Sequence, residues 1–567
     1  MAVTGSFRDL LATVLAHAQS GPDRPCVQTF SRRTKAEGRT FGEVAEAAAR
    51  AAAFLHEHGL KRGDVVVLLG THHIDFYAAW LGCVWLGAIP TVLAEPTVRV
   101  AKDIYWSRLR ELLSRVEAWG LALDPRVKLD EQIPLPGHAY RYDQIAAGAG
   151  PAPPRVVPQA EETLLLQHSS GTTGLQKGVM LSHQAIWRHA QSYHRHLGFR
   201  DSDVVASWLP LYHDMGFVAC FIGSLLQGTP VIWLSPFEWV ANPALLLDAV
   251  SEHRATLAWL PNFAFAFLTQ RVKAERGKYD LSSLRALVNC SEPVLAEAMR
   301  AFASRFAADG FAPGALQACY AMAENVFAVS SSNGESPPRF RTLDRRIWTA
   351  EHRAVPVAAE TPDALVHVSN GPCVEGCEAK IVDADGKILP ALTAGQVLIR
   401  SPFLFTGYFR RDDLNSKLFD AEGFFHTRDV GYLDEAGHVY ITGRQNDLII
   451  SGGKNIYPQD IEQVAGEVPG VYPGRIVCFG VSLHDLGTEG LVVLFESEEP
   501  QETWAEVERQ VRISVPARLD LDVFDTRIVP RGTLRKSTSG KLARDGNRQW
   551  YLAGKFGSIS QDITPEN

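Results

Sequence analysis

The chain has 567 residues, of which 46% are apolar and 21% charged, and its formal net charge is −8. This length and composition predict a globular protein of two or three domains, and the acidic balance excludes bulk attraction to nucleic acid or to anionic membranes. Eight cysteines are scattered along the chain without a zinc-binding spacing, which indicates reduced thiols in a cytoplasmic protein.

The predicted elements alternate between helices and short buried strands. Apolar residues recur at helical spacing between Phe41 and Leu55, and Gly59 stands where that helix would end. Continuous apolar runs then predict strands at residues 65–69, 163–166, 204–209, 231–234, 256–260 and 284–288. This alternation is typical of a largely parallel sheet with helices on both faces.

Other segments mark the organisation of the chain. Residues 146–158 are rich in alanine, glycine and proline and predict a linker, and residues 330–338 predict a polar loop. The apolar stretch Met215–Leu234 is interrupted by glycine and proline, so it predicts a buried helix and a strand, not a membrane span. Beyond Arg444 enough chain remains for a small α+β domain.

The sharpest chemical feature is the segment Ser169–Gly178, SSGTTGLQKG, which lies between a predicted strand and a helix capped by Ser182. Its glycines let the backbone approach an anion closely, and its N–H groups, hydroxyls and lysine suit phosphate oxygens. It is not a Walker A loop, because Gly178 follows the lysine where serine or threonine is required. The alternative is a flexible linker. The predicted phosphate ligands are Ser169, Ser170, Gly171, Thr172, Thr173, Gly174 and Lys177.

This segment resembles the phosphate loop of the adenylate-forming superfamily, which contains acyl-CoA synthetases, peptide-synthetase adenylation domains, fatty acyl-AMP ligases and beetle luciferases. The resemblance recurs in order across nearly the whole chain and is greatest to the fatty acyl-AMP ligases. It implies an α/β fold with a large N-terminal domain of layered α/β subdomains, residues 1–444. It also implies a small mobile α+β C-terminal domain, residues 445–567, with a hinge near Asn446.

Two segments resemble the borders of the family's acyl site. Residues 208–216, WLPLYHDMG, imply a pocket border, with His213 as the catalytic residue that positions the reacting carboxylate. Residues 261–265, PNFAF, imply a pocket wall. Taken alone, this histidine and this apolar stripe are each more typical of a core. The implied substrate contacts are Tyr212, His213, Met215, Gly216, Asn262 and Phe263.

Further segments resemble the nucleotide site. The resemblance implies that Tyr320 stacks on adenine, that Glu324 is a catalytic ligand of Mg²⁺, and that Asp429 accepts the ribose hydroxyls. A ring face suits a purine, and a carboxylate suits Mg²⁺. Arg428 stands where glycine is common. The implied nucleotide contacts are Ser291, Glu292, Pro293, Tyr320, Ala321, Met322, Ala323, Asp429 and Arg444.

The segment 531–541, RGTLRKSTSGK, resembles the family's C-terminal lysine motif. The resemblance implies that Lys541 is catalytic and touches the carboxylate and the α-phosphate, where negative charge builds up during attack. In isolation such a basic run is more often a solvated loop.

The resemblance implies ATP and Mg²⁺ as cofactors, a fatty acid substrate, and an acyl-AMP product formed with release of pyrophosphate. An apparent insertion at residues 340–357 favours transfer to the phosphopantetheine thiol of an acyl carrier protein. One alternative is an acyl-CoA synthetase, which uses CoA as the acceptor. A second is a non-catalytic nucleotide-binding protein, which would bind ATP without pyrophosphate exchange.

Overall fold

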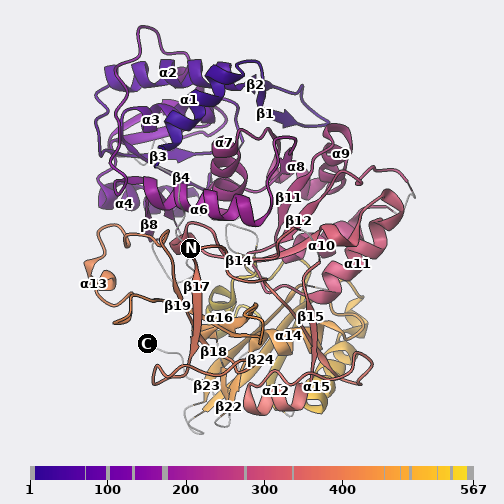
Figure 1. The fold of residues 1–567 in the computed structure, drawn as a ribbon. Helices are drawn as coiled ribbons and strands as arrows, with labels where there is room; N and C mark the ends of the chain where they lie inside the picture. Colours follow the sequence, from indigo (N-terminus) through magenta and orange to yellow (C-terminus); the bar gives the residue numbers. More distant parts are fainter. Residues whose placement is uncertain are drawn as a thin grey trace.

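The computed structural model describes residues 7–70, 72–96, 102–129, 135–168, 177–273, 277–334, 337–447, 449–451, 454–472, 474–483, 488–519, 521–536 and 541–557. The N-terminal part, coloured indigo to pink, is stacked on the C-terminal part, coloured orange to yellow (Figure 1). The predicted phosphate ligands Ser169, Ser170, Gly171, Thr172, Thr173 and Gly174 lie outside the described residues.

The first layer is a six-stranded sheet in the order β6-β5-β3-β4-β7-β8, parallel except for the β7–β8 pair. Alternate residues of β3 join different cores, since Val66 and Leu68 pack with helices α2 and α3, and Val67 packs with α4. The sheet is therefore covered on both faces. Its elements are β3 (Val65–Leu69), β4 (Ile89–Leu93), β5 (Gly120–Leu123), β6 (His138–Arg141), β7 (Thr163–His168), β8 (Gly178–Ser182), α2 (Phe41–Glu57), α3 (Phe76–Trp85), α4 (Lys102–Val116) and α5 (Tyr142–Ala146).

The second layer is an eight-stranded sheet in the order β14-β13-β12-β11-β9-β10-β1-β2, antiparallel only at its two edges. Its strands are β1 (Pro25–Phe30), β2 (Gly38–Thr40), β9 (Val205–Ser207), β10 (Val231–Leu234), β11 (Leu257–Leu260), β12 (Ala286–Asn289), β13 (Leu316–Ala321) and β14 (Ala328–Ser331). The associated helices are α1 (Leu10–Ser20), α6 (His183–His196), α7 (Gly223–Gln227), α8 (Pro236–Ala241), α9 (Ala244–His253), α10 (Asn262–Arg271), α11 (Ala296–Phe306), η2 (Ala307–Asp309), η3 (Pro313–Ala315) and η4 (Ala323–Asn325).

One large core joins these two layers, and a buried π-helix, η1 (Met215–Ile222), belongs to it. The ring of Trp80 on α3 lies 5.8 Å from that of Phe217 and 5.3 Å from that of Phe221, both on η1. π-Helices are rare and often occur at functional sites. The packing of α3 on η1 therefore fixes the helix that begins next to His213.

The third layer is an antiparallel sheet of β17 (Glu378–Val382), β18 (Gly395–Arg400), β19 (Phe425–Leu433) and β20 (Val439–Arg444), with α13 (Asp412–Asn415) in a loop between β18 and β19. The predicted insertion forms β15 (Phe340–Leu343) and α12 (Arg345–Glu351), and β15 pairs with β16 (Leu365–Val368).

The C-terminal lobe, defined here as the elements from β21 to α16, has its own cores on both faces of a three-stranded sheet, β23-β24-β25. A 3₁₀ turn, η5 (Gln445–Asp447), precedes it. The lobe contains β21 (Ile449–Ser451), β22 (Lys454–Ile456), α14 (Pro458–Gly466), β23 (Ile476–Leu483), β24 (Thr488–Ser497), η7 (Gln501–Thr503), α15 (Trp504–Leu519), β25 (Val523–Pro530) and α16 (Arg544–Leu552). The position of the domain boundary at residues 444/445 and the mobility of the lobe stay predictions.

The α/β prediction is confirmed, and β3 and β10 have the predicted bounds. The predicted strand 204–209 is shorter, because the chain leaves the sheet after Ser207. The predicted polar loop 330–338 was wrong at its start, because Ser330 and Ser331 are buried in β14, where their hydroxyls bond to backbone carbonyls. Among the described residues, no helix is both long and apolar enough to cross a membrane.

We expect Trp80→Ala to lower the free energy of unfolding by about 3–5 kcal/mol, because truncating a fully buried indole leaves a cavity between α3 and η1. Urea unfolding followed by circular dichroism measures the change. Trp550→Ala is the control, since that side chain is 38% exposed and should cost less than about 1 kcal/mol. Equal losses in the two variants would contradict the packing assignment.

Candidate active site

The predicted ribose contacts meet on two neighbouring strands. Asp429 on β19 lies opposite Arg444 on β20 in the antiparallel register. The Asp429 carboxylate is buried, accepts a hydrogen bond from Tyr320 Oη at 2.5 Å, and accepts one from Arg444 Nε at 3.2 Å. Burial raises the pKa of Asp429, while Arg444 and Tyr320 oppose that rise. The three side chains thus form one polar group with an exposed arginine at its edge.

The predicted magnesium ligand is held by a residue that the sequence analysis missed. Tyr408 Oη donates a hydrogen bond of 2.8 Å to Glu324 Oε1. Burial raises the pKa of Glu324, and this hydrogen bond acts to lower it. The Lys177 ammonium lies 5.1 Å from the centroid of the same tyrosine ring. Nothing in the sequence around Tyr408 signals this contact, because its partner is 84 residues away.

Glu324 is the candidate metal carboxylate of the site. In the described part of the chain, no group of three or more His, Cys, Asp or Glu side chains could hold a metal ion. Mg²⁺ is commonly held by one or two carboxylates together with substrate phosphates. Glu324 fits that pattern as a single carboxylate, held through its Oε1 by Tyr408. The residues present therefore fit a magnesium ion that arrives with a nucleotide.

His213 and Asp214 are in contact at the start of η1. His213 Nδ1 lies 2.7 Å from Asp214 Oδ1, which also accepts a hydrogen bond from the backbone N–H of Met215 at 2.8 Å. Burial acts to raise the pKa of Asp214, but His213, Lys541 and that N–H hold it below its usual range. Gly216 is required here, because a Cβ would lie 2.5 Å from the Pro210 carbonyl oxygen.

The predicted acyl-pocket wall is tied to the turn after β12. Asn262 Oδ1 accepts hydrogen bonds from Asn289 Nδ2 and Leu295 N, both at 3.0 Å, so this side chain fixes the turn from inside. The backbone N–H of Phe263 donates to Glu292 Oε2 at 2.9 Å. The Asn262 side chain and the Phe263 backbone thus join the start of α10 to the turn after β12. The Phe263 ring packs against the large core.

The remaining predicted contacts surround this centre. Ser291 Oγ lies 3.8 Å from Met215 Sδ, and Tyr212 O accepts from Gln167 Nε2 at 3.0 Å. Pro293 is exposed, whereas Ala321 and Met322 are half-buried and Ala323 is buried. No contact in the described residues assigns these four side chains a role, so their nucleotide contacts stay predictions.

Lys541 reaches this centre from the C-terminal lobe. Burial lowers the pKa of its ammonium group, the charges of Glu292 and Asp214 act to raise it, and Arg444 acts to lower it further. These interactions place the lysine between the residues expected around the acyl group and those expected around the ribose. The structure therefore gathers His213, Glu292, Glu324, Asp429, Arg444 and Lys541 at one junction of the two lobes.

Comparison with known proteins gives a consistent result over the whole chain. A family model described as an AMP-binding enzyme matches residues 14–409. Rv1013 of Mycobacterium tuberculosis, which is named as a ligase, is 31% identical over 515 residues, covering 89% of this chain and 93% of that protein. The medium-chain-fatty-acid–[acyl-carrier-protein] ligase JamA of Moorena producens is 29% identical over 532 residues, covering 89% and 88%.

A solved structure extends the likeness to the fold. It comes from studies of fatty acyl-adenylate ligases from E. coli and L. pneumophila, and it has a TM-score of 0.87 at 26% identity. The match covers 97% of this chain and 98% of that one. The arrangement of a large N-terminal part and a smaller C-terminal part is therefore shared.

We expect Tyr408→Phe to make Mg·ATP binding fail at a higher pH than in the unsubstituted chain. The hydroxyl stabilises ionised Glu324, so its removal raises a pKa that burial already raises. As the pH is lowered, the affinity of the variant for Mg·ATP therefore falls at a higher pH than that of the unsubstituted chain. Isothermal titration with Mg·ATP from pH 5 to pH 8 measures this shift.

Tyr551→Phe is the matched control, because Tyr551 also donates to a carboxylate, that of Asp525 at 2.6 Å, but outside the site. A titration with ATP and EDTA should remove the difference between the Tyr408 variant and the unsubstituted chain. Superimposable pH profiles with Mg·ATP would show that Tyr408 does not tune Glu324.

Proposed function

We propose that the chain activates a fatty acid, starting from its membership of the AMP-binding enzyme family. It is an ATP-binding ligase of the adenylate-forming class. In the first step a carboxylate oxygen attacks the α-phosphorus of ATP. The new O–P bond forms as the bond from the α-phosphorus to the bridging oxygen breaks, giving acyl-AMP and pyrophosphate. The observation that carries the proposal is the electrostatic interaction of Lys541, from the C-terminal lobe, with Glu292, Asp214 and Arg444.

Positioning and charge neutralisation provide the catalysis in such a displacement. A half-buried ammonium is most effective where negative charge grows in the transition state. The charge of Lys541 interacts with that of Asp214, which contacts His213 at the start of η1. We assign His213 to orienting the fatty acid carboxylate and Lys541 to the oxygens that gain charge. Mg²⁺ bound with ATP would supply charge neutralisation at the phosphates, with Glu324 as its protein ligand.

The nucleotide half of the proposal assigns the ribose to Asp429 and Arg444. A carboxylate suits a diol as a hydrogen-bond acceptor, and Tyr320 holds this one in place. Since Tyr320 Oη is engaged with Asp429, the ring of Tyr320 is fixed, and its face is assigned to adenine. The family resemblance and the meeting of these three side chains support this assignment.

For the second step we propose transfer of the acyl group to the phosphopantetheine thiol of an acyl carrier protein. The insertion supports this acceptor, because α12 contacts the C-terminal lobe through Trp348. Trp348 Nε1 donates to Asp460 Oδ2 at 3.0 Å, and its ring stacks on Tyr457 with centroids 5.7 Å apart. Burial raises the pKa of Asp460 to about 6, with Trp348 and Arg345 opposing the rise.

These contacts must break if the lobe rotates to deliver a thiol. A hydrogen bond to a charged group contributes about 1.5–3 kcal/mol, and the stacked rings add to that cost. A carrier protein can offset the cost with its own protein–protein interface, whereas CoA offers a smaller surface. The similarity to a carrier-protein ligase points the same way. Acyl-CoA synthesis is the alternative at the same site.

We expect ATP–pyrophosphate exchange that depends on a fatty acid and falls by about 10²–10³-fold in Lys541→Ala, because the variant lacks the charge that stabilises the transition state. A panel of acids from short to long chain measures the exchange and its preference together. Lys555→Ala is the matched control, an exposed lysine just beyond α16. Mg·ATP binding without exchange for any acid would favour the non-catalytic alternative instead.

We expect Trp348→Phe to raise CoA thioester formation by about 3- to 30-fold, since it removes the hydrogen bond to Asp460 and loosens the lobe. Pyrophosphate exchange should stay the same or fall. Trp233→Phe, which removes a buried indole hydrogen bond to Tyr77 in the N-terminal part, is the control. Fast CoA transfer by the unsubstituted chain, unchanged in Trp348→Phe, would favour the acyl-CoA synthetase alternative.

A further inference from the structure

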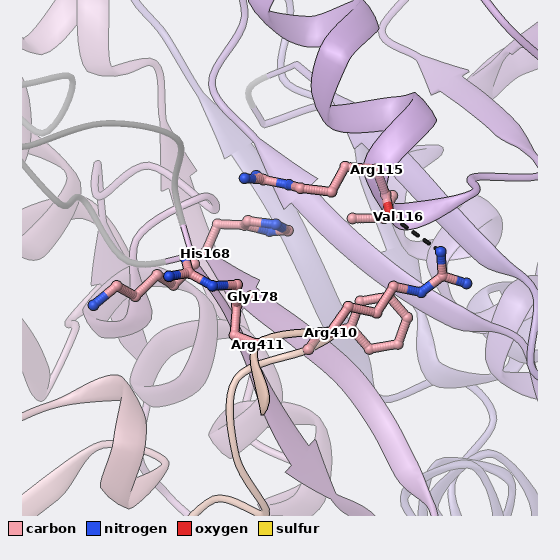
Figure 2. Close-up of a pocket in the computed structure, with 8 residues that line it drawn as sticks. Arg115, Val116, His168, Gly178, Arg410 and Arg411 are labelled. Atoms are coloured by element: carbon pink, nitrogen blue, oxygen red, sulfur yellow. Dashed lines mark hydrogen bonds between the residues drawn. The ribbon is translucent and has the colours of Figure 1, made fainter. Parts of the chain in front are cut away.

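A small pocket lies between the helix α6 and the π-helix η1. It is separate from the pocket that Lys177 and Gly178 line (Figure 2), which belongs to the phosphate end of the proposed site. Most of its walls are apolar, and they come from both helices and from the residue before β14. The apolar side chains are Ile186, Ala190, Val218, Ala219, Ile222 and Phe327. Such walls suit a hydrocarbon chain.

Two elements connect this pocket to the proposed reaction. The helix η1 begins directly after the contact between His213 and Asp214, and its residues that line the pocket lie further along the same helix. Phe327 comes three residues after Glu324. A fatty acid whose carboxylate is held at His213, and whose chain follows η1, therefore reaches this pocket with a part of the chain that is distant from the carboxylate.

His189 of α6 brings a hydrogen-bond donor to this apolar pocket. The residue is only 2% exposed, and its Nε2 lies 2.9 Å from the backbone N of Ala328. Because a backbone N–H can only donate, Nε2 accepts this hydrogen bond and the ring proton is on Nδ1. Burial lowers the pKa of His189 to about 3, so the ring is neutral at pH 7. The pocket thus contains a neutral N–H donor.

This donor is available to a ligand. Among the described residues, His189 makes no other side-chain hydrogen bond. The other polar side chains of the pocket have partners, since the Tyr193 hydroxyl accepts from Trp259 Nε1 at 2.9 Å and His194 is hydrogen-bonded to Gln227. A buried donor that stays unpaired is costly, so a ligand with an acceptor atom gains affinity at this position.

We propose that this pocket receives an oxygen substituent on the chain of the fatty acid, a hydroxyl or a keto group, to which the Nδ1–H of His189 donates. The inference rests on the proposed function and names its substrate class, an oxygenated fatty acid instead of a plain saturated one. One neutral donor suits one neutral acceptor oxygen, whereas a second ionised group would be costly among these apolar walls. A plain chain would leave the donor unpaired.

ATP–pyrophosphate exchange with matched acids tests this proposal. The acids are decanoic acid, its derivatives with a single hydroxyl or keto group at each chain position, and the methyl-branched acids of similar shape. We expect kcat/KM for an oxygenated acid to exceed that for its methyl-branched counterpart by about tenfold or more. This ratio should fall towards one in His189→Met, which has no donor. His189→Gln, which keeps an acceptor and a donor, should recover part of it.

His196→Met is the matched control, because His196 is on the same helix and bonds to the Ser331 carbonyl oxygen at 2.7 Å but does not line the pocket. It should keep the ratio of the two kcat/KM values. A folding defect lowers both values alike, and thermal unfolding of each variant detects it. Equal kcat/KM values for the oxygenated and methyl-branched acids in the unsubstituted chain would overturn the proposal. So would a preference that His189→Met keeps in full.

Failure of the proposed function is distinguishable from failure of this assignment. Exchange with decanoic acid that gains nothing from an oxygen substituent rejects the assignment and leaves the function in place. If no acid supports exchange, each acid is titrated by calorimetry into the unsubstituted chain in the presence of Mg·ATP. Saturable heat with an oxygenated acid that is lost in His189→Met and kept in His196→Met supports the pocket without the adenylation step. The absence of binding heat with every acid overturns the pocket as well.

Discussion

The electrostatic balance around Lys541 connects the two parts of the molecule. A lysine from the C-terminal lobe lies near Glu292 and Asp214, more than two hundred residues earlier in the chain. Burying an ammonium group without compensating charge is costly. The carboxylates offset that cost only when the lobe is docked, so the position of the lobe and the charge state of the site depend on each other.

Among the contacts that hold the docked lobe, two regions on different elements bear on the proposed reaction. One is the charge cluster at Lys541. The other is the hydrogen bond from Trp348 to Asp460 together with the stacking of Trp348 on Tyr457. The first involves groups that the proposed function assigns to the substrates, whereas the second involves none of them. A reaction that changes the charge near Lys541 therefore weakens one contact region and leaves the other in place. If the lobe rotates as proposed, the contacts of the insertion add to the energy that an acceptor must supply.

Sequence reasoning predicted the local elements better than the contacts between them. Continuous apolar runs gave the full bounds of β3 and β10, because a strand buried on both faces has no polar alternation. Composition failed at Ser330, whose hydroxyl bonds to the Asn370 carbonyl oxygen inside the fold. Burial of a polar side chain depends on a partner that only the fold provides, and no local pattern marks it.

The same distinction holds within the site. Ordered motifs predicted Asp429, Glu324 and Lys541 as site residues, and the fold brings all three to one junction, although their roles stay proposals. Tyr408 was missed because its contact with Glu324 spans 84 residues. Residue type and spacing mark chemistry within one segment but not across segments.

The backbone has an unusual conformation next to three carboxylates of the site, those of Glu292, Glu324 and Asp429. Ser291, Val326 and Arg428 have φ angles of +73°, +64° and +63°, and each lies within two residues of Glu292, Glu324 or Asp429. Such conformations cost about 1–3 kcal/mol for non-glycine residues and persist only where the surroundings fix them. The position of Arg428, where glycine is common in the family, is the clearest case, since glycine adopts this conformation without that cost.

Next to each of these turns, a hydrogen bond from another element holds the carboxylate in place. The Phe263 N–H holds Glu292, Tyr408 holds Glu324, and Tyr320 holds Asp429. Each carboxylate is therefore held in two ways, by the backbone conformation of a neighbouring residue and by a donor that is distant in the sequence. Because all three are also buried enough to have raised pKa values, their ionised forms depend on these donors and on the cations that face them. Strain, burial and hydrogen bonding at these turns thus act together to hold three carboxylates at fixed points of the site.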